Sequence, residues 1–255
     1  RDLMPVVDLG LQPLANSLKA TADGRDEVIP LSVSFCPESG LLQLDQTVDR
    51  SVLFDQYFWV TGTSVGANRW ATQFVASTAE AASLNARDLV IEIASNDGTF
   101  LGGFKRLGYE NVLGVEPAQN IAEIANNAGL ETIPKFWDAQ LAGDIAREYG
   151  KASLVIARNV IAHMSDLLGA IEGVARVLKD DGLGVIEFHY AGDILQGLQY
   201  DSIYHEHLCY FSLKSFSGLL KRFDLHSYHV MRSPISGGAL AVFFSKANHP
   251  ITREQ

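Results

Sequence analysis

Short apolar runs alternate with amphipathic stretches from about residue 88 onward. The apolar runs fall at residues 89–93, 112–115, 131–133, 153–157 and 184–188. The amphipathic stretches between them cover residues 99–107, 118–128, 138–148 and 166–178. Gly108 and Gly129 end the first two stretches, and Asp166 is suited to cap the last one. This alternation predicts β-α units that build an α/β fold around an open, mostly parallel sheet.

The rhythm changes after the fifth apolar run. Residues 212–223 predict a helix, and residues 225–231 and 239–244 predict two strands. Two consecutive strands with no helix between them form an antiparallel pair. A mostly parallel, seven-stranded sheet that ends in such a hairpin resembles the Rossmann-like fold of class I methyltransferases, which use S-adenosylmethionine (SAM). Fold by itself does not determine function, so the motifs have to be weighed separately.

The first part of the chain has a different pattern. Residues 1–50 contain four prolines and short apolar runs, which predict a small irregular or β-rich lobe. Residues 69–84 predict a helix that leads into the main domain. We therefore expect a small substrate-side lobe over residues 1–68 and a methyltransferase domain over residues 69–255.

Composition excludes several classes of protein. Hydrophobic residues make up 47% of the 255 residues, which is too high a fraction for a disordered chain. The sequence has no long uncharged apolar run of the kind that predicts a membrane span. Twenty Lys and Arg against thirty Asp and Glu leave a net charge of −10, which argues against a nucleic-acid partner. Two distant cysteines, Cys36 and Cys209, build neither a disulfide framework nor a four-cysteine metal site. With no secretory signal, we expect a cytoplasmic protein that acts on a small molecule.

The most informative motif follows the first predicted strand. It consists of Glu92, Ala94, Ser95, Asn96, Asp97 and Gly98, a polar loop between a strand and a helix. Ligands of open α/β sheets bind beside such loops, where backbone N–H groups and a glycine allow close approach. Glu116 and Pro117 follow the second strand, and an acid there accepts hydrogen bonds from ribose hydroxyls. Together they predict a site for an adenosine-containing cofactor.

The loop favours SAM over a dinucleotide. A pyrophosphate needs a glycine-rich cradle, whereas this loop has one glycine and an acid, Asp97, that would repel phosphate. The same acid suits the positive charges of SAM. Other expected cofactor-binding residues follow the third and fourth strands: Phe136, Trp137, Asn159 and His163. For the two aromatic residues, ordinary core packing is an equally good interpretation, and for His163 a packed or capping role is the stronger one.

Residues 200–212 gather aromatic, imidazole and carboxylate groups beyond the fifth strand. Histidine can remove a proton near neutral pH, a carboxylate can orient its ring, and a tyrosine hydroxyl can donate to an enolate oxygen. The stretch therefore suits deprotonation next to a carbonyl. Two other interpretations remain open: a metal held by His205 and His207 as alternate residues of a strand, although no third ligand is evident, or a purely structural cluster.

The motifs at residues 92–99, 114–118, 157–163 and 204–212 resemble those of the C-methyltransferases of deoxysugar biosynthesis. The stretches 7–16 and 36–40 look like the N-terminal lobe of that family. The resemblance implies methylation of a carbon next to the ketone of a nucleotide-linked 4-keto-deoxyhexose. It implies His207 as the base, Tyr204 and Glu206 as catalytic partners that hold the sugar and its enolate, and Tyr57, Tyr204 and His205 as substrate-binding residues.

The sequence also departs from the family. A zinc site with two Cys-x-x-Cys pairs is usual in its N-terminal lobe, but here only Cys36 remains of the second pair, so the cysteines present complete no metal site. Ala94 stands where glycine is usual, and the family continues into a further C-terminal domain. Two other hypotheses therefore stay open: a SAM-dependent methyltransferase of another small molecule, and a non-catalytic SAM-fold module.

Overall fold

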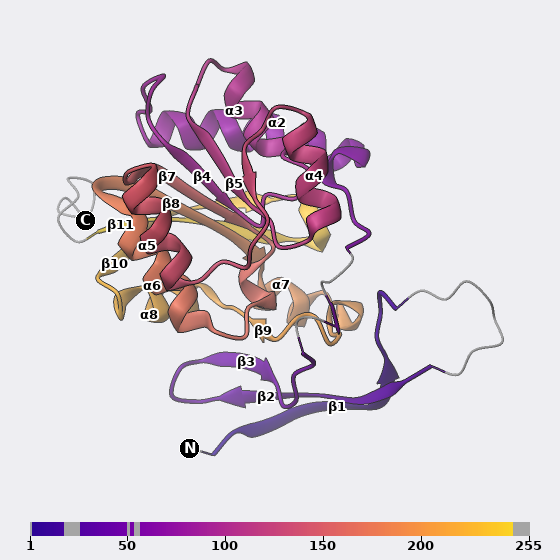
Figure 1. Ribbon diagram of the computed structural model, residues 1–255. Coiled ribbons are helices and arrows are strands. Elements are labelled where there is room, and N and C mark those ends of the chain that lie inside the picture. Colours follow the sequence, from indigo (N-terminus) through magenta and orange to yellow (C-terminus); the bar gives the residue numbers. More distant parts are fainter. Residues whose placement is uncertain (1, 18–25, 50–51, 54–56, 247–255) are drawn as a thin grey trace.

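The computed structural model describes residues 2–17, 26–49, 52–53 and 57–246 (Figure 1). The larger of its two sheets has seven strands in the order β10-β11-β8-β7-β4-β5-β6. They are β4 (Val90–Ile93), β5 (Val112–Val115), β6 (Thr132–Ile133), β7 (Ala152–Arg158), β8 (Leu178–His189), β10 (Leu225–Ser233) and β11 (Ala239–Lys246). The first five along the chain pair in parallel, and β11 is antiparallel to both neighbours. The predicted α/β fold with a terminal hairpin is confirmed.

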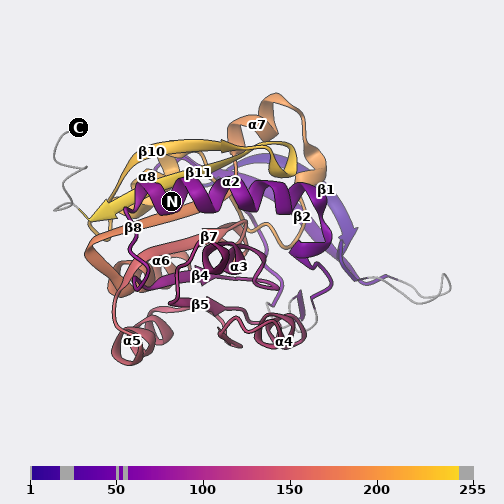
Figure 2. The same ribbon diagram turned by 90° about the horizontal axis from the view of Figure 1, so that it is seen from above.

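Helices cover both faces of this sheet. They are α2 (Val65–Ala81), α3 (Thr99–Arg106), α4 (Gln119–Asn127), α5 (Ala139–Glu148), α6 (Leu167–Val177), α7 (Ala191–Gln196) and α8 (Leu213–Lys221). The α2 and α3 helices pack on one face, and α5, α6 and α8 pack on the other. Figure 2 looks down onto α2, which runs along the sheet. Asp138 and Asp166 cap α5 and α6, as the sequence predicts for Asp166.

Alternation along β4 shows why the sheet is buried on both sides. Val90 belongs to the core under α2 and α3, whereas Ile91 and Ile93 belong to the core under α5, α6 and α8. Side chains of a strand point to opposite faces in turn, so a continuous apolar run fills both cores. The α2 helix begins at Val65, four residues before the predicted start, because the Ser64 side chain accepts a hydrogen bond from the Ala67 N–H.

The smaller sheet joins distant parts of the chain. Its antiparallel strands β1 (Met4–Pro13), β2 (Val28–Cys36) and β3 (Leu41–Leu44) are completed by β9 (Cys209–Tyr210). In Figure 1, β1, β2 and β3 lie next to β9, on the side of the large sheet where α7 lies. Residues 204–208 form a turn rather than a strand, with the His207 N–H donating to the Tyr204 carbonyl. The expectation that His205 and His207 alternate along a strand is therefore wrong.

Candidate active site

The polar loop after β4 is strained and tied to β5. Ala94 and Asn96 have φ angles of 53° and 51°, and Gly98, which precedes α3, has a φ of 76°. A positive φ is unfavourable for residues with a Cβ, which explains why glycine suits the position of Ala94. The Ser95 N–H donates to the Val115 carbonyl at 3.2 Å. This bond holds the loop at the carboxyl end of the sheet.

Glu116 lies directly against this loop. Its Oε2 atom accepts a hydrogen bond from the Asn96 N–H and its Oε1 atom one from the Ala118 N–H, both at 3.0 Å. Burial raises the pKa of this carboxyl, and the two N–H groups act in the opposite direction. Each oxygen keeps a second lone pair, so Glu116 can still accept hydrogen bonds from a ligand.

The loop also carries the segment that precedes α2. The Asn96 amide accepts from the Thr61 N–H at 2.8 Å and donates to the Trp59 carbonyl at 2.9 Å. The Asp97 Oδ2 atom accepts from the Gly62 N–H at 2.8 Å, while its Oδ1 atom accepts from the Thr99 hydroxyl at 2.7 Å. Asp97 thus holds the 59–62 segment against the loop, an anchoring role that its sequence context does not indicate.

Two buried oxygen atoms beneath the loop have no hydrogen-bond partner among the described residues: Glu92 Oε2 and Ser95 Oγ. Burial raises the pKa of Glu92 to about 7, opposed by the Arg158 guanidinium, whose Nε lies 3.4 Å from Glu92 Oε1. Unpaired buried polar atoms are costly, so these oxygens suit a ligand that brings donors. The residues here fit the ammonium and ribose hydroxyl groups of SAM.

Asn159, at the end of β7, is held by a buried acid. Its N–H donates to the main-chain carbonyl of Glu187 at 2.8 Å, its Nδ2 donates to the Glu187 carboxylate at 3.4 Å, and its φ is 50°. The fully buried Glu187 carboxylate also accepts from Trp70 Nε1 at 2.8 Å. Asn159 Oδ1 is buried and unpartnered among the described residues. Sequence reasoning missed Glu187, whose signal is an acid within an otherwise apolar run.

The two aromatic residues after β6 have different surroundings. Trp137 is buried, donates from Nε1 to the Ala170 carbonyl at 3.0 Å and belongs to the core under α5 and α6. Phe136 is half-buried in the loop between β6 and α5. Pro117, also half-buried, follows Glu116 at the end of β5. Trp137 thus has the core position that was the alternative interpretation.

Both nitrogens of the His207 imidazole form hydrogen bonds. Its Nδ1 lies 2.8 Å from the Ser202 carbonyl oxygen, and its Nε2 lies 3.0 Å from the Tyr204 hydroxyl. A carbonyl oxygen only accepts, so Nδ1 carries the proton and Nε2 accepts from the Tyr204 hydroxyl. His207 therefore presents an unprotonated Nε2, the form that a general base requires.

Two further imidazoles flank His207. The ring centroids of His163 and His189 lie 4.8 and 5.1 Å from that of His207. Burial, reinforced by these neighbours, lowers the pKa of His207 to about 3, and burial lowers that of His163 to about 4. His189 was not predicted as a site residue, although a histidine at the carboxyl end of the fifth strand is a detectable signal.

Glu206 and Tyr57 connect this cluster to the cofactor loop. Glu206 is buried, which raises the pKa of its carboxyl, and its Oε1 atom accepts from Asn16 Nδ2 at 2.6 Å. Burial, together with the charges of Glu206 and Glu116, raises the pKa of Tyr57 to about 12. Tyr57 is thus close to the acids of both groups. His205 is not directed into the cluster, because its Nε2 lies 3.2 Å from the Ile29 carbonyl oxygen in β2.

The cysteines do not fit a zinc site. Cys36 ends β2, whereas Cys209 is buried in β9, and burial raises the pKa of the Cys209 thiol to about 12. A thiol must lose its proton to bind zinc. Within residues 2–17, 26–49, 52–53 and 57–246, no group of three or more His, Cys, Asp or Glu side chains could hold a metal ion.

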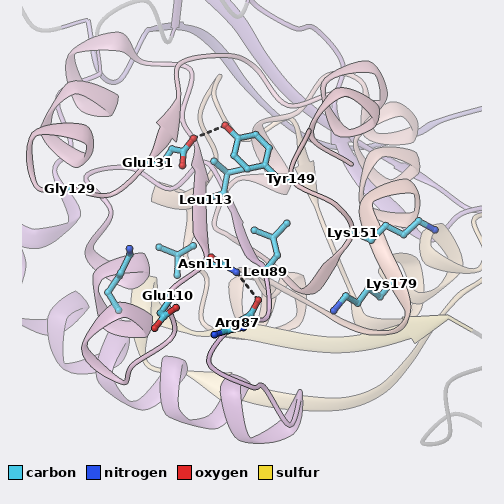
Figure 3. Close-up of a pocket in the computed structure, with 12 residues that line it drawn as sticks. Arg87, Leu89, Glu110, Asn111, Leu113, Gly129, Glu131, Tyr149, Lys151 and Lys179 are labelled. Atoms are coloured by element: carbon cyan, nitrogen blue, oxygen red, sulfur yellow. Dashed lines mark hydrogen bonds between the residues drawn. The ribbon is translucent and has the colours of Figure 1, made fainter. Parts of the chain in front are cut away.

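A cavity of about 500 Å³ lies at the opposite edge of the sheet (Figure 3). Arg87, Lys105, Lys151 and Lys179 surround it, and the Tyr149 hydroxyl donates to Glu131 at its rim. These residues lie at the amino ends of the strands. The cavity therefore does not include the loop or the His207 cluster, both of which lie at the carboxyl ends.

Comparison with known proteins agrees with this fold. The sequence profile of the family described as "Methyltransferase domain" matches residues 67–230, and one described as "Putative zinc binding domain" matches residues 1–54. Magnesium protoporphyrin IX methyltransferase from Synechocystis PCC 6803, solved with bound S-adenosylhomocysteine, superposes with a TM-score of 0.56 at 15% identity, covering 71% of this chain and 84% of that one. A SAM-dependent methyltransferase from Clostridium acetobutylicum superposes with a TM-score of 0.55 at 13% identity, covering 70% and 92%.

The fold is that of a class I methyltransferase, and the chain belongs to the methyltransferase family. The C-methyltransferase NovU of Streptomyces niveus is 35% identical over 248 residues, which is 96% of this chain. The chain spans 59% of the length of that relative. No helix in the described part of the chain is long and apolar enough to cross a membrane.

Proposed function

We propose that this protein binds SAM at the loop after β4 and transfers its methyl group to a carbon next to a ketone. The observation that carries the proposal is the unprotonated Nε2 of His207, which faces the Tyr204 hydroxyl at 3.0 Å. Tyr57, whose pKa responds to both Glu206 and Glu116, connects this base with the cofactor loop. The similarity to a C-methyltransferase supports the same reaction.

The cofactor would be held by Ser95, Asn96, Glu116 and Asn159, with Phe136 against its adenine. When bound, SAM supplies an electrophilic methyl group on a positively charged sulfur. The chain's own contribution is to place carboxylate lone pairs and side-chain oxygens at one edge of the sheet, because N–H groups of the loop, including those of Ser95 and Asn96, already donate within the protein. Such a ligand would provide partners for the Ser95 and Asn159 side-chain oxygens, which have none among the described residues.

The proposed proton transfer starts at the acceptor carbon. His207 Nε2 takes the proton next to the ketone, and the C–H electron pair becomes that of an enolate. The Tyr204 hydroxyl, released from Nε2, donates to the enolate oxygen, and Glu206 accepts from a hydroxyl of the acceptor. The enolate carbon would then form a carbon–carbon bond to the methyl group in line while the methyl–sulfur bond breaks, so that its electron pair goes to sulfur, S-adenosylhomocysteine leaves and the ketone re-forms. Positioning supplies much of the rate of such a step.

The low pKa of free His207 keeps its imidazole neutral, although it also makes Nε2 a weak base before the acceptor binds. At neutral pH the imidazole is neutral, with its one proton on Nδ1 and none on Nε2, so Nε2 can accept a proton once the Tyr204 hydroxyl moves away. Negative charge that develops on the acceptor beside it raises the pKa of the imidazole in the complex. We infer from the resemblance that the acceptor is a nucleotide-linked deoxysugar of natural-product biosynthesis.

Calorimetry with SAM and proton exchange in heavy water test the two halves of the proposal. We expect SAM binding, and exchange of the proton next to the ketone of a 4-keto sugar nucleotide that His207→Asn abolishes. Binding without exchange would leave a non-catalytic SAM-fold module or a methyltransferase of another acceptor. Absence of SAM binding would remove every methyltransferase interpretation.

A further inference from the structure

Asn16 places an amide from the N-terminal lobe in contact with the candidate active site. Its Nδ2 atom donates to Glu206 Oε1 at 2.6 Å, across 190 positions of sequence. Asn16 follows β1 in a turn closed by a hydrogen bond from the Ser17 N–H to the Leu14 carbonyl. Asparagine is favoured in such turns, so the local sequence presents the amide outward from the strand.

The lobe is fastened to the residues around Glu206 by independent contacts. The β3 strand pairs with β9, and the Leu44 N–H donates to the Leu208 carbonyl at 3.0 Å. His205 Nε2 contacts the Ile29 carbonyl of β2 at 3.2 Å. Glu206 lies between two residues that the lobe holds. The Asn16 contact is therefore part of a continuous attachment and does not depend on one side chain finding its partner.

The contact acts on the charge and direction of Glu206. Glu206 is 3% exposed as a residue, and a buried anion is stable only when donors satisfy it. Asn16 supplies one donor to Oε1. A hydrogen bond at Oε1 fixes the rotation of the carboxylate, and Oε2 is then free to accept from a ligand.

We propose that Asn16 is a positioning residue that keeps Glu206 ionised and correctly turned for the acceptor. The N-terminal lobe thereby contributes to the reaction through the amide of Asn16. This inference rests on the proposed function, because Glu206 is assigned there to the acceptor. Nothing in it requires Asn16 itself to touch the acceptor or SAM.

Three variants test the proposal in the full chain. Asn16→Ala removes the donor, and we expect kcat/KM for exchange with a nucleotide-linked 4-keto-deoxyhexose to fall roughly tenfold to a hundredfold, the range for a hydrogen bond to a charged group. Asn16→Asp keeps the shape but sets two carboxyl groups against each other. Its activity should recover as pH falls, because a shared proton restores one hydrogen bond. Ser17→Ala, next to Asn16 in the same turn, is the matched control and should match the wild type.

A double-mutant cycle separates positioning from simple attachment of the lobe. In a Glu206→Gln background, Asn16→Ala should have little further effect, because the two residues act as a unit. Additive losses, or an Asn16→Asp variant whose activity does not depend on pH, would overturn the proposal.

A second measurement needs no activity. The Tm of Asn16→Asp relative to that of the wild type at the same pH should fall as pH rises, and the same comparison in a Glu206→Gln background should show no such change. If the wild type shows no proton exchange, the proposed function fails. The stability measurement still tests the contact between Asn16 and Glu206 in that case. A difference in Tm between Asn16→Asp and the wild type that does not change with pH would contradict the contact itself.

Discussion

Gly114 lies where β5 passes beneath the cofactor loop, and it has no room for a side chain. A Cβ at this position would lie 2.5 Å from Ser95 Oγ, 2.7 Å from Thr132 Oγ1 and 3.0 Å from Leu101 Cδ1. Separations below 3.0 Å force neighbouring atoms to move. Ser95 belongs to the loop, so a Gly114→Ala substitution should disturb the proposed cofactor site directly.

The expected magnitudes follow from overpacking of a close-packed interior. An added methyl group without space costs about 1–3 kcal/mol. At about 2–4 °C per kcal/mol for a domain of this size, Tm should fall by about 2–12 °C. If displacement of Ser95 reduces the free energy of SAM binding by about 1.4 kcal/mol, the Kd for SAM rises about tenfold.

Differential scanning calorimetry and titration calorimetry with SAM measure the two effects. Gly218→Ala is the matched control, because Gly218 is exposed in α8 and a Cβ there meets nothing within 4 Å. That change should stabilise the protein by up to about 1 kcal/mol and leave SAM affinity unchanged. A Gly114→Ala variant with the Tm and SAM affinity of the wild type would refute the proposed location of the cofactor.

Three further results are expected. Glu116→Ala should weaken SAM binding at least tenfold by calorimetry, whereas Glu123→Ala on the exposed face of α4 should not; equal affinities would exclude Glu116 from the site. In the folded protein the pKa values of His163 and His207 are about 4 and 3, below the ordinary 6.5. Between pH 6.5 and these values the unfolded chain therefore binds more protons than the folded one. Tm should therefore fall on acidification from pH 6.5 toward 4, and a flat profile would contradict the buried neutral imidazoles. Tyr204→Phe should slow exchange by about 10²–10³-fold, the loss typical of an oxyanion donor, without the complete loss expected for His207→Asn. Identical losses would contradict the separate roles of donor and base.

The sheet could be predicted from sequence because local pattern determines it. The apolar run at Val90–Ile93 and the cap at Asp166 need no distant partner to be identified. The loop and Glu116 could also be placed together, since carboxyl ends of neighbouring parallel strands meet at one edge. Their observed contact, from the Asn96 N–H to Glu116, follows from that geometry.

Other parts depend on tertiary pairing. Residues 204–208 form a turn because β9 joins the N-terminal sheet. No local sequence pattern predicts that β9 pairs with β3. Asn16 and Glu206 meet across the lobe boundary, and Glu187 gathers donors from α2, β10 and the end of β7. Trp137 illustrates the remaining ambiguity, because an aromatic residue after a strand suits a ligand or a core equally well until its neighbours are known.

Methyl transfer from isotope-labelled SAM tests the central claim most directly. The wild-type protein is incubated with SAM that carries a labelled methyl group and with a nucleotide-linked 4-keto-deoxyhexose, and the product is examined by carbon NMR. We predict that the labelled methyl group is bonded to the carbon next to the ketone, shown by its one-bond carbon–carbon coupling, and that His207→Asn gives none of this product. Label on oxygen or nitrogen, or label on the same carbon with His207→Asn, would contradict the account.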